Sequence, residues 1–191
     1  MKKQDSTNVK KTPRKTKIQE LLEKGGKLNQ EEIKEIFDRF DYNGNGILSL
    51  AEIDKAIAET YPLLAKDKPA LMRAYKAADA SKDGFIDSNE FGRLLDLLYY
   101  YNDVYKKFKK LDKNNDKRIN YQEFKEGHKM IGIKVASEKD LKAEFDKIDA
   151  NGGGYILFDE FCLFVSKKKQ HDDKEAEKAE NVENAEKPIE Q

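Results

Sequence analysis

The sequence predicts an all-α fold built from four helix–loop–helix units that associate in two pairs. A twelve-residue pattern of spaced oxygen-bearing side chains, a tight turn and a closing glutamate occurs at 41–52, 79–90, 112–123 and 149–160. Successive copies begin 38, 33 and 37 residues apart, a period typical of repeated supersecondary units. Apolar residues recur at helical spacing on both sides of each copy, so the resulting amphipathic helices need a shared core.

The apolar pattern predicts one helix before and one after each loop. Ahead of the loops, apolar residues lie one and four positions back: Phe40 and Phe37, Ala78 and Tyr75, Leu111 and Phe108, Ile148 and Phe145. Behind the third loop the pattern is weaker, because Phe124 is followed by Gly127 and His128. We therefore expect a weaker helix at that point.

The connection between the second and third loops, residues 91–111, is 21 residues long. It is shorter than the 26 and 25 residues that join the loops within each half, by a little over one helical turn. It contains no proline, and its only glycine is Gly92 near its start. We expect a near-continuous or tightly turned helix here, which would couple the two halves.

The twelve-residue loops resemble the calcium loop of the EF-hand, and the resemblance covers about residues 29–166. Ca²⁺ takes six to eight oxygen ligands, and this loop supplies them from positions 1, 3, 5, 9 and 12 and from the backbone carbonyl of position 7, with glycine at position 6. In EF-hands the eighth residue forms a short antiparallel β bridge to the partner loop. We therefore expect loop 1 to pair with loop 2 and loop 3 with loop 4, through Leu48, Ile86, Ile119 and Ile156.

Loops 1 and 2 both have complete ligand sets with a turn glycine. Loop 2 is the stronger candidate because four of its side-chain ligands are carboxylates: Asp79, Ser81, Asp83, Asp87 and Glu90, with the carbonyl of Phe85. Loop 1 offers Asp41, Asn43, Asn45, Ser49 and Glu52, with the carbonyl of Ile47. Since only two of these ligands are charged, we expect loop 1 to bind calcium less tightly than loop 2.

Loop 3 has a good ligand set but lacks the turn glycine. Its ligands are Asp112, Asn114, Asp116, Asn120 and Glu123, with the carbonyl of Arg118. Lys117 stands at position 6, where left-handed backbone costs a residue with a side chain about 1–2 kcal/mol. Three carboxylates outweigh this cost, so we expect loop 3 to bind calcium.

Loop 4 keeps fewer ligands, namely Asp149, Asn151 and Glu160 with the carbonyl of Tyr155. Position 5 is Gly153 and position 9 is Leu157, which offers no oxygen. We expect this loop to be weak or non-binding and to serve mainly as the structural partner of loop 3, although water can complete a weak site. Magnesium, which uses fewer protein oxygens, is an alternative occupant of the loops at low calcium.

Charge is unevenly distributed along the chain although the formal net charge is zero. Residues 1–17 contain seven Lys or Arg and one acidic residue, whereas residues 171–191 contain eight Asp or Glu and three Lys. Neither end shows apolar periodicity. We expect a basic disordered arm at 1–27, EF-hand pairs at 28–98 and 99–167, and an acidic disordered tail at 168–191. The basic arm is either a solubilising tail, which we favour, or a contact for an acidic surface such as anionic lipid or tubulin; we expect no nucleic-acid partner.

Several classes of protein are excluded by missing features. The single cysteine, Cys162, rules out an intramolecular disulfide, and two histidines are too few for a zinc site. No run of about 18 apolar residues occurs, and position 2 is not glycine, so we expect neither a membrane span nor a lipid anchor. No nucleophile–base pair or phosphate-binding loop is present, so we expect a cytoplasmic protein that is not an enzyme.

The second half is also similar to the flagellar calcium-binding proteins (calflagins). The stretches that carry this resemblance are NEFGRLLDLLYYYNDVYKKFKKLD, YQEFKEGHKMIGIKV and FDKIDANGGGYILFDEF. The resemblance implies a calcium-responsive protein of a cilium or flagellum. Two features depart from that family: the N-terminal acylation motif is missing, and loop 1 is more complete than the resemblance leads us to expect.

The leading functional hypothesis is a calcium sensor or calcium-regulated adaptor. Calcium would open the helix pairs and expose an apolar groove for a protein target, such as an amphipathic helix or a cytoskeletal component. With only three methionines in the chain, we expect few and specific partners. The alternatives are a calcium buffer that barely changes shape and a constitutive structural component of a cytoskeletal or axonemal assembly.

Overall fold

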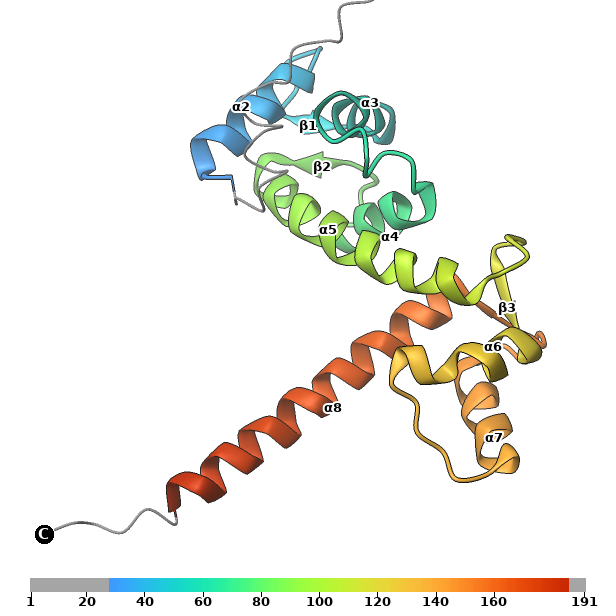
Figure 1. Ribbon diagram of the computed structural model, residues 1–191. Coiled ribbons are helices and arrows are strands. Elements are labelled where there is room, and N and C mark those ends of the chain that lie inside the picture. The colour runs from blue at the N-terminus through green and yellow to red at the C-terminus, as the bar shows by residue number, and fades with distance from the viewer. Residues whose placement is uncertain (1–27, 186–191) are drawn as a thin grey trace, which may run out of the picture.

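The computed structural model describes residues 28–185, which form two helix–loop–helix pairs joined by one long helix (Figure 1). The first pair and the joining helix comprise α2 (Gln30–Phe40), β1 (Ile47–Leu48), α3 (Leu50–Thr60), α4 (Lys68–Ala78), β2 (Ile86–Asp87) and α5 (Ser88–Leu111). The rest comprises β3 (Arg118–Asn120), α6 (Tyr121–Gly127), the 3₁₀ helix η1 (His128–Ile131), α7 (Glu138–Ile148), β4 (Tyr155–Leu157) and α8 (Phe158–Ala185). The predicted all-α fold is confirmed.

Short antiparallel bridges pair the loops as predicted. Leu48 of β1 lies opposite Ile86 of β2, and Ile119 of β3 lies opposite Ile156 of β4. All four side chains are fully buried. Each bridge therefore fixes two loops side by side, and its side chains become part of the core of that lobe.

Two aromatic-rich cores divide the molecule into lobes. In the first, Phe37 and Phe91 pack edge to face with ring centroids 5.7 Å apart. In the second, Phe108 packs in the same way against Phe161 at 5.6 Å. These rings come from the helices on either side of the loops, so the cores hold the helix ends that position each loop.

α5 is continuous from loop 2 to loop 3, which confirms the predicted helical link (Figure 1). Its first half packs in the first core and its second half in the second core. Between them lies Asn102, a polar residue that is only 2% exposed and donates from Nδ2 to Asp67 at 3.2 Å. Lys109 approaches the other oxygen of Asp67 at 2.8 Å. Because Asp67 precedes α4, these bonds tie α4 to the middle of α5, where the lobes meet.

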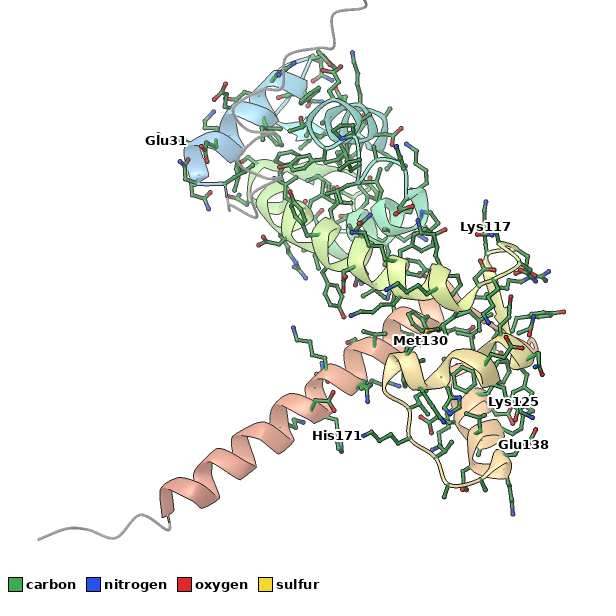
Figure 2. The ribbon with its side chains drawn as sticks, viewed as in Figure 1. Glu31, Lys117, Lys125, Met130, Glu138 and His171 are labelled. Carbon is green, nitrogen blue, oxygen red and sulfur yellow. The ribbon has the colours of Figure 1, made fainter. Side chains whose placement is uncertain are left out.

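The helix behind the third loop is short, as the sequence predicts. α6 ends at Gly127, where a Cβ atom would lie 2.0 Å from Cδ2 of Leu111, and the chain continues as η1. Gly132 then adopts φ 74°, a left-handed conformation that ends η1. Lys125 of α6 and Glu138 of α7, joined at 2.6 Å, connect the two helices across this turn (Figure 2).

The C-terminal helix is longer than expected. The predicted disordered tail begins at residue 168, but α8 continues to Ala185 and extends away from both lobes (Figure 1). The physical reason is that the packed first turns of α8 nucleate the helix, and a following sequence rich in Ala, Glu and Lys propagates it. The basic arm at 1–27 and the end of the acidic tail at 186–191 lie outside the described residues. No helix between residues 28 and 185 is both long and apolar enough to span a bilayer.

Candidate metal centres

All four loops share one backbone arrangement around the aspartate at position 1. In each loop one oxygen of this carboxylate accepts the N–H of position 6, at distances of 2.8, 3.1, 3.0 and 2.8 Å in loops 1 to 4. These bonds bend the chain around the carboxylate. The loop geometry that calcium requires is therefore present even in loop 4, which has the weakest ligand set.

The glutamate at position 12 performs two tasks in loops 2 and 3. One oxygen of Glu90 accepts the N–H of Ala80 at 2.9 Å, and the other accepts the N–H of Asp87 at 3.2 Å. Glu123 bonds in the same way to the start of loop 3 and to Asn120. Each glutamate thus links the beginning of its loop to the first turn of the helix that follows.

The residue at position 9 is also the N-cap of the following helix, a second role that sequence reasoning missed. Ser49, Asp87 and Asn120 each form a capping box with the glutamate three residues later. In loop 1 the carboxylate of Glu52 bonds to the N–H and hydroxyl of Ser49, at 2.9 and 2.7 Å. Glu52 is therefore engaged with its own helix start, whereas the position-12 residues of the other loops also reach across the loop.

Position 6 is left-handed in every loop, including loop 3, where φ of Lys117 is 66°. The expectation that Lys117 carries this strained conformation is confirmed, and Figure 2 shows it at the tip of its loop. Position 4 is left-handed as well, which the sequence analysis missed: Gly44, Lys82, Asn115 and Gly152 have φ between 58° and 67°. In the sequence, the glycines at position 4 of loops 1 and 4 indicate this left-handed conformation.

Loop 3 contains a competitor for calcium that sequence reasoning also missed. The guanidinium of Arg118 lies 3.3 Å from one oxygen of Asp116, while the N–H of Arg118 bonds to the other at 2.9 Å. The same guanidinium stacks over the ring of Tyr155 in loop 4, 4.4 Å from its centroid. Calcium must therefore displace Arg118 from Asp116 or share that carboxylate with it.

Loop 4 has the expected gaps at positions 5 and 9. A Cβ atom at Gly153 would lie 2.6 Å from Oδ1 of Asn151, which occupies part of the space where a position-5 ligand would begin. Leu157 is 42% exposed and provides no oxygen to cap α8. Glu160 nevertheless accepts the N–H of Asn151 at 3.2 Å, so the hydrogen bond that links position 12 to the start of the loop is still present.

Buried carboxylates favour a cation in the second lobe. Asp112, Glu123 and Asp149 are 4%, 7% and 6% exposed. Among the residues that the structure describes, none of the three pairs with Lys or Arg; backbone N–H groups are their donors. Desolvated anions held only by backbone dipoles are stabilised further by a divalent cation, so these residues suit calcium.

The oxygens are held apart by these same hydrogen bonds. Within residues 28–185, no three Asp, Glu, His or Cys side chains converge into a ready cluster. The loops rely instead on carboxylates together with Asn and Ser oxygens and one carbonyl, and the side-chain oxygens are engaged with backbone N–H groups of their own loop. Binding an ion therefore requires exchange of several of these hydrogen bonds.

α4 also supports loop 2 directly. The hydroxyl of Tyr75 donates a hydrogen bond to the carbonyl of Gly84 at the turn. Burial raises the pKa of Tyr75, and the nearby carboxylates of Asp79, Asp83 and Glu90 raise it further. The neutral phenol thus remains a donor at physiological pH and holds the turn in place.

Comparison with known proteins agrees with this geometry. The profile of the FCaBP EF-hand domain matches residues 18–100, and that of the EF-hand domain pair matches residues 101–166. The flagellar calcium-binding protein TB-24 of Trypanosoma brucei brucei is 31% identical over 153 residues, which cover 71% of this chain and 68% of the relative. This chain belongs to the flagellar calcium-binding proteins. It is a calcium-binding EF-hand protein and not an enzyme.

Two further relatives place the family match in context. The flagellar calcium-binding protein TB-44A of the same organism is 33% identical over 156 residues, but this chain spans only 36% of that relative. The probable calcium-binding protein CML27 of Arabidopsis thaliana is 29% identical over 136 residues, covering 70% of this chain and 76% of the relative. The profile of the FCaBP EF-hand domain matches the first half of the chain. Similarity to the flagellar calcium-binding proteins is therefore not confined to the second-half stretches that predicted it.

Proposed function

We propose that this flagellar calcium-binding protein is a calcium sensor and adaptor that engages a protein partner. The observation that carries this proposal is the double role of the glutamates at position 12. In loops 2 and 3 the same carboxylate contacts the start of the loop and caps the following helix. A ligand that reorganises this carboxylate therefore acts directly on the orientation of a helix.

The proposed mechanism follows from the ligand geometry of calcium. In an EF-hand, the position-12 glutamate contributes both oxygens to the ion. Glu90 and Glu123 would then give up their hydrogen bonds to the N–H groups at the start of the loop. The helix that each one caps would move with its carboxylate, the helix pair would open, and apolar surface would become available to a partner.

We propose that loops 1, 2 and 3 bind calcium and that loop 4 is mainly structural. Loop 2 keeps the most carboxylates, and its turn is braced by Tyr75. Loop 3 has buried carboxylates, but Arg118 competes with calcium for one of its ligands, Asp116. Loop 1 has fewer charges and a glutamate held near Ser49. Magnesium would occupy the same loops at low calcium through fewer protein oxygens.

Calorimetric calcium titration of the full chain tests these assignments. The variants Glu52→Gln, Glu90→Gln and Glu123→Gln should each remove or strongly weaken one binding step, while Glu160→Gln should change little. In parallel, calcium should increase the fluorescence of an apolar dye added to the wild-type chain. Calcium binding without any dye response would contradict the sensor mechanism.

A buffer remains the competing function because the lobes are tied together. The buried bond between Asn102 and Asp67 restrains α4 against α5 and would limit opening of the first lobe. Nearly identical circular dichroism and small-angle scattering with and without calcium would favour the buffer. A constitutive structural role would instead be supported by retention on cytoskeletal filaments in the presence of a chelator.

We also propose a cilium or flagellum as the place of action. The support is that two trypanosome relatives, TB-44A and TB-24, are flagellar calcium-binding proteins. Immunofluorescence of the full chain in a flagellated cell should show the axoneme or flagellar membrane. A uniform cytoplasmic signal would contradict this location and leave the calcium chemistry unaffected.

A further inference from the structure

A groove of about 900 Å³ opens in the second lobe between α7, α8 and the loop that joins η1 to α7. Its walls include six apolar residues: Ile133, Val135, Ile148, Ala150, Leu163 and Phe164. Leu163 is 51% exposed, so its aliphatic side chain is accessible to a ligand in the groove. The volume lies within the roughly 300–1,000 Å³ range of binding pockets.

The lining of the groove includes residues of α8 from Leu163 to Asp172. The helix contributes a stripe of residues spaced one and four positions apart: Leu163, Phe164, Lys167, Lys168, His171 and Asp172. Ten residues of helix span about 14 Å. Figure 2 shows His171 near the point where α8 leaves the lobe. This length suits a segment of peptide chain better than a compact small molecule.

The rim of the groove carries an excess of unpaired positive charge. Glu144 is already paired with Lys147 at 2.9 Å, and the carboxylate of Glu160 is bonded within loop 4. By contrast, Lys134 and Lys167 form no ion pair among the described residues. Lys168 donates to the carbonyl of Gly132 at 3.1 Å and carries its charge beside them. Asp172, at the far end, is the remaining acidic residue of the lining.

We propose that this groove binds an acidic amphipathic segment of a partner protein. Apolar side chains of the segment would cover Leu163 and Phe164, and flanking carboxylates would face Lys134 and Lys167. This inference rests on the proposed adaptor function and specifies the chemistry of the partner. Residues 1–17 of the chain itself are basic, like the rim of the groove, so their charge does not suit the site. As far as Ala185, the acidic part of α8 leads away from the lobe and not into the groove.

The groove is joined to loop 4 through shared residues. Ala150 and Glu160 line the groove and occupy positions 2 and 12 of that loop. A partner that fixes α7 and α8 therefore also fixes the residues that would surround an ion in loop 4. By reciprocity of linked binding, any factor by which partner docking changes calcium binding at this loop is the factor by which calcium changes docking.

A pair of synthetic helical peptides tests the proposal on the full chain. Both carry leucine and phenylalanine on one face; the flanking residues are glutamates in one peptide and lysines in the other. Fluorescence anisotropy in calcium should show the glutamate peptide binding about tenfold more tightly, and K134E/K167E should reverse the preference by a similar factor. The matched control K139E/K169E changes two exposed lysines outside the groove and should leave binding within about twofold of wild type.

Any other outcome of these experiments counts against the proposal. Equal or tighter binding of the lysine peptide, or equal loss in both double variants, would overturn it. Binding of phosphatidylserine vesicles that depends on Lys134 and Lys167, without binding of the glutamate peptide, would assign the groove to lipid instead. Self-association measured by sedimentation and abolished by K134E/K167E would assign it to a second copy. The apolar-dye experiment without any peptide tests the sensor separately: a dye response to calcium with no glutamate-peptide preference defeats only this inference.

Discussion

At positions 4 and 6 of each loop the backbone is left-handed, so the residue type there decides how much strain the loop carries. Loops 1 and 4 have glycine at both positions, loop 2 has Lys82 and a glycine, and loop 3 has Asn115 and Lys117. Asparagine tolerates this conformation better than lysine does. The loops with the most carboxylates therefore carry strain, and the glycine-rich loop 4 combines low strain with few ligands.

Replacing Lys117 with glycine should tighten calcium binding at loop 3. Where the left-handed turn becomes fixed only on binding, the substitution removes a cost of about 1–2 kcal/mol, partly offset by the roughly 0.5–1 kcal/mol of extra backbone entropy that glycine loses, so we expect a gain of about two- to fivefold. Lys117→Ala is the matched control, because it removes the lysine charge but keeps the Cβ atom. Calorimetry should show a larger gain for glycine than for alanine; equal gains would assign the effect to charge alone.

Replacing Leu157 with serine should improve loop 4 in two ways. Serine at this position would cap α8, as Ser49 caps α3, and would supply the missing oxygen at position 9. Relative to Leu157→Ala, which leaves the cap empty, the serine variant should be about 1 kcal/mol more stable to denaturant. It should also gain a calcium step in calorimetry, whereas the alanine variant should not. Equal stability of the two variants would contradict the capping argument.

At the level of elements, local patterns predicted most of the fold. The apolar residues before each loop identified α2, α4, α7 and the end of α5, and the aliphatic eighth residues identified both bridges. The length of α8 was missed because its charged second half has no apolar stripe; it depends on nucleation by its packed beginning. The contact of Arg118 with Asp116 was also missed, since it depends on a side-chain orientation that spacing does not encode.

The packing of α8 predicts an unreactive thiol. Cys162 is 2% exposed, and burial raises the pKa of its thiol to about 12. At pH 8 the folded chain should react slowly with an aromatic disulfide reagent, and denaturant should restore the reactivity of an ordinary thiol with a pKa of roughly 8.5. Fast reaction of the folded chain would mean that α8 detaches from the core.

The same thiol should contribute to the pH dependence of stability. Its pKa is raised in the folded state, so its contribution is intact below the unfolded pKa of roughly 8.5 and is lost as pH rises from there toward about 12. Between pH 8 and pH 10 the free energy of unfolding should therefore fall more for wild type than for Cys162→Ala. Equal falls would show that the buried tyrosines alone account for alkaline destabilisation.

At the scale of the whole molecule, two sets of contacts make the lobes one unit. α5 contributes to both cores, and α4 is tied to its middle by Asp67 and Asn102. On the other side of the junction, Arg73 of α4 lies 3.5 Å from Asp159 in the first turn of α8 and stacks over Tyr101 of α5. A change at loop 4 can therefore reach α4, which leads into loop 2, through contiguous contacts.

Loss of the buried bond at the junction should weaken this coupling. Asn102→Ala leaves one oxygen of Asp67 without its amide donor and should lower the free energy of unfolding by about 1–3 kcal/mol. Asn89→Ala, which removes an exposed amide from the first turn of the same helix, is the control and should change stability little. In NMR relaxation the wild-type lobes should share one rotational correlation time, and those of Asn102→Ala should begin to diverge. Separate tumbling of the lobes in the wild-type chain would show that α5 bends freely and that calcium signals stay within each lobe.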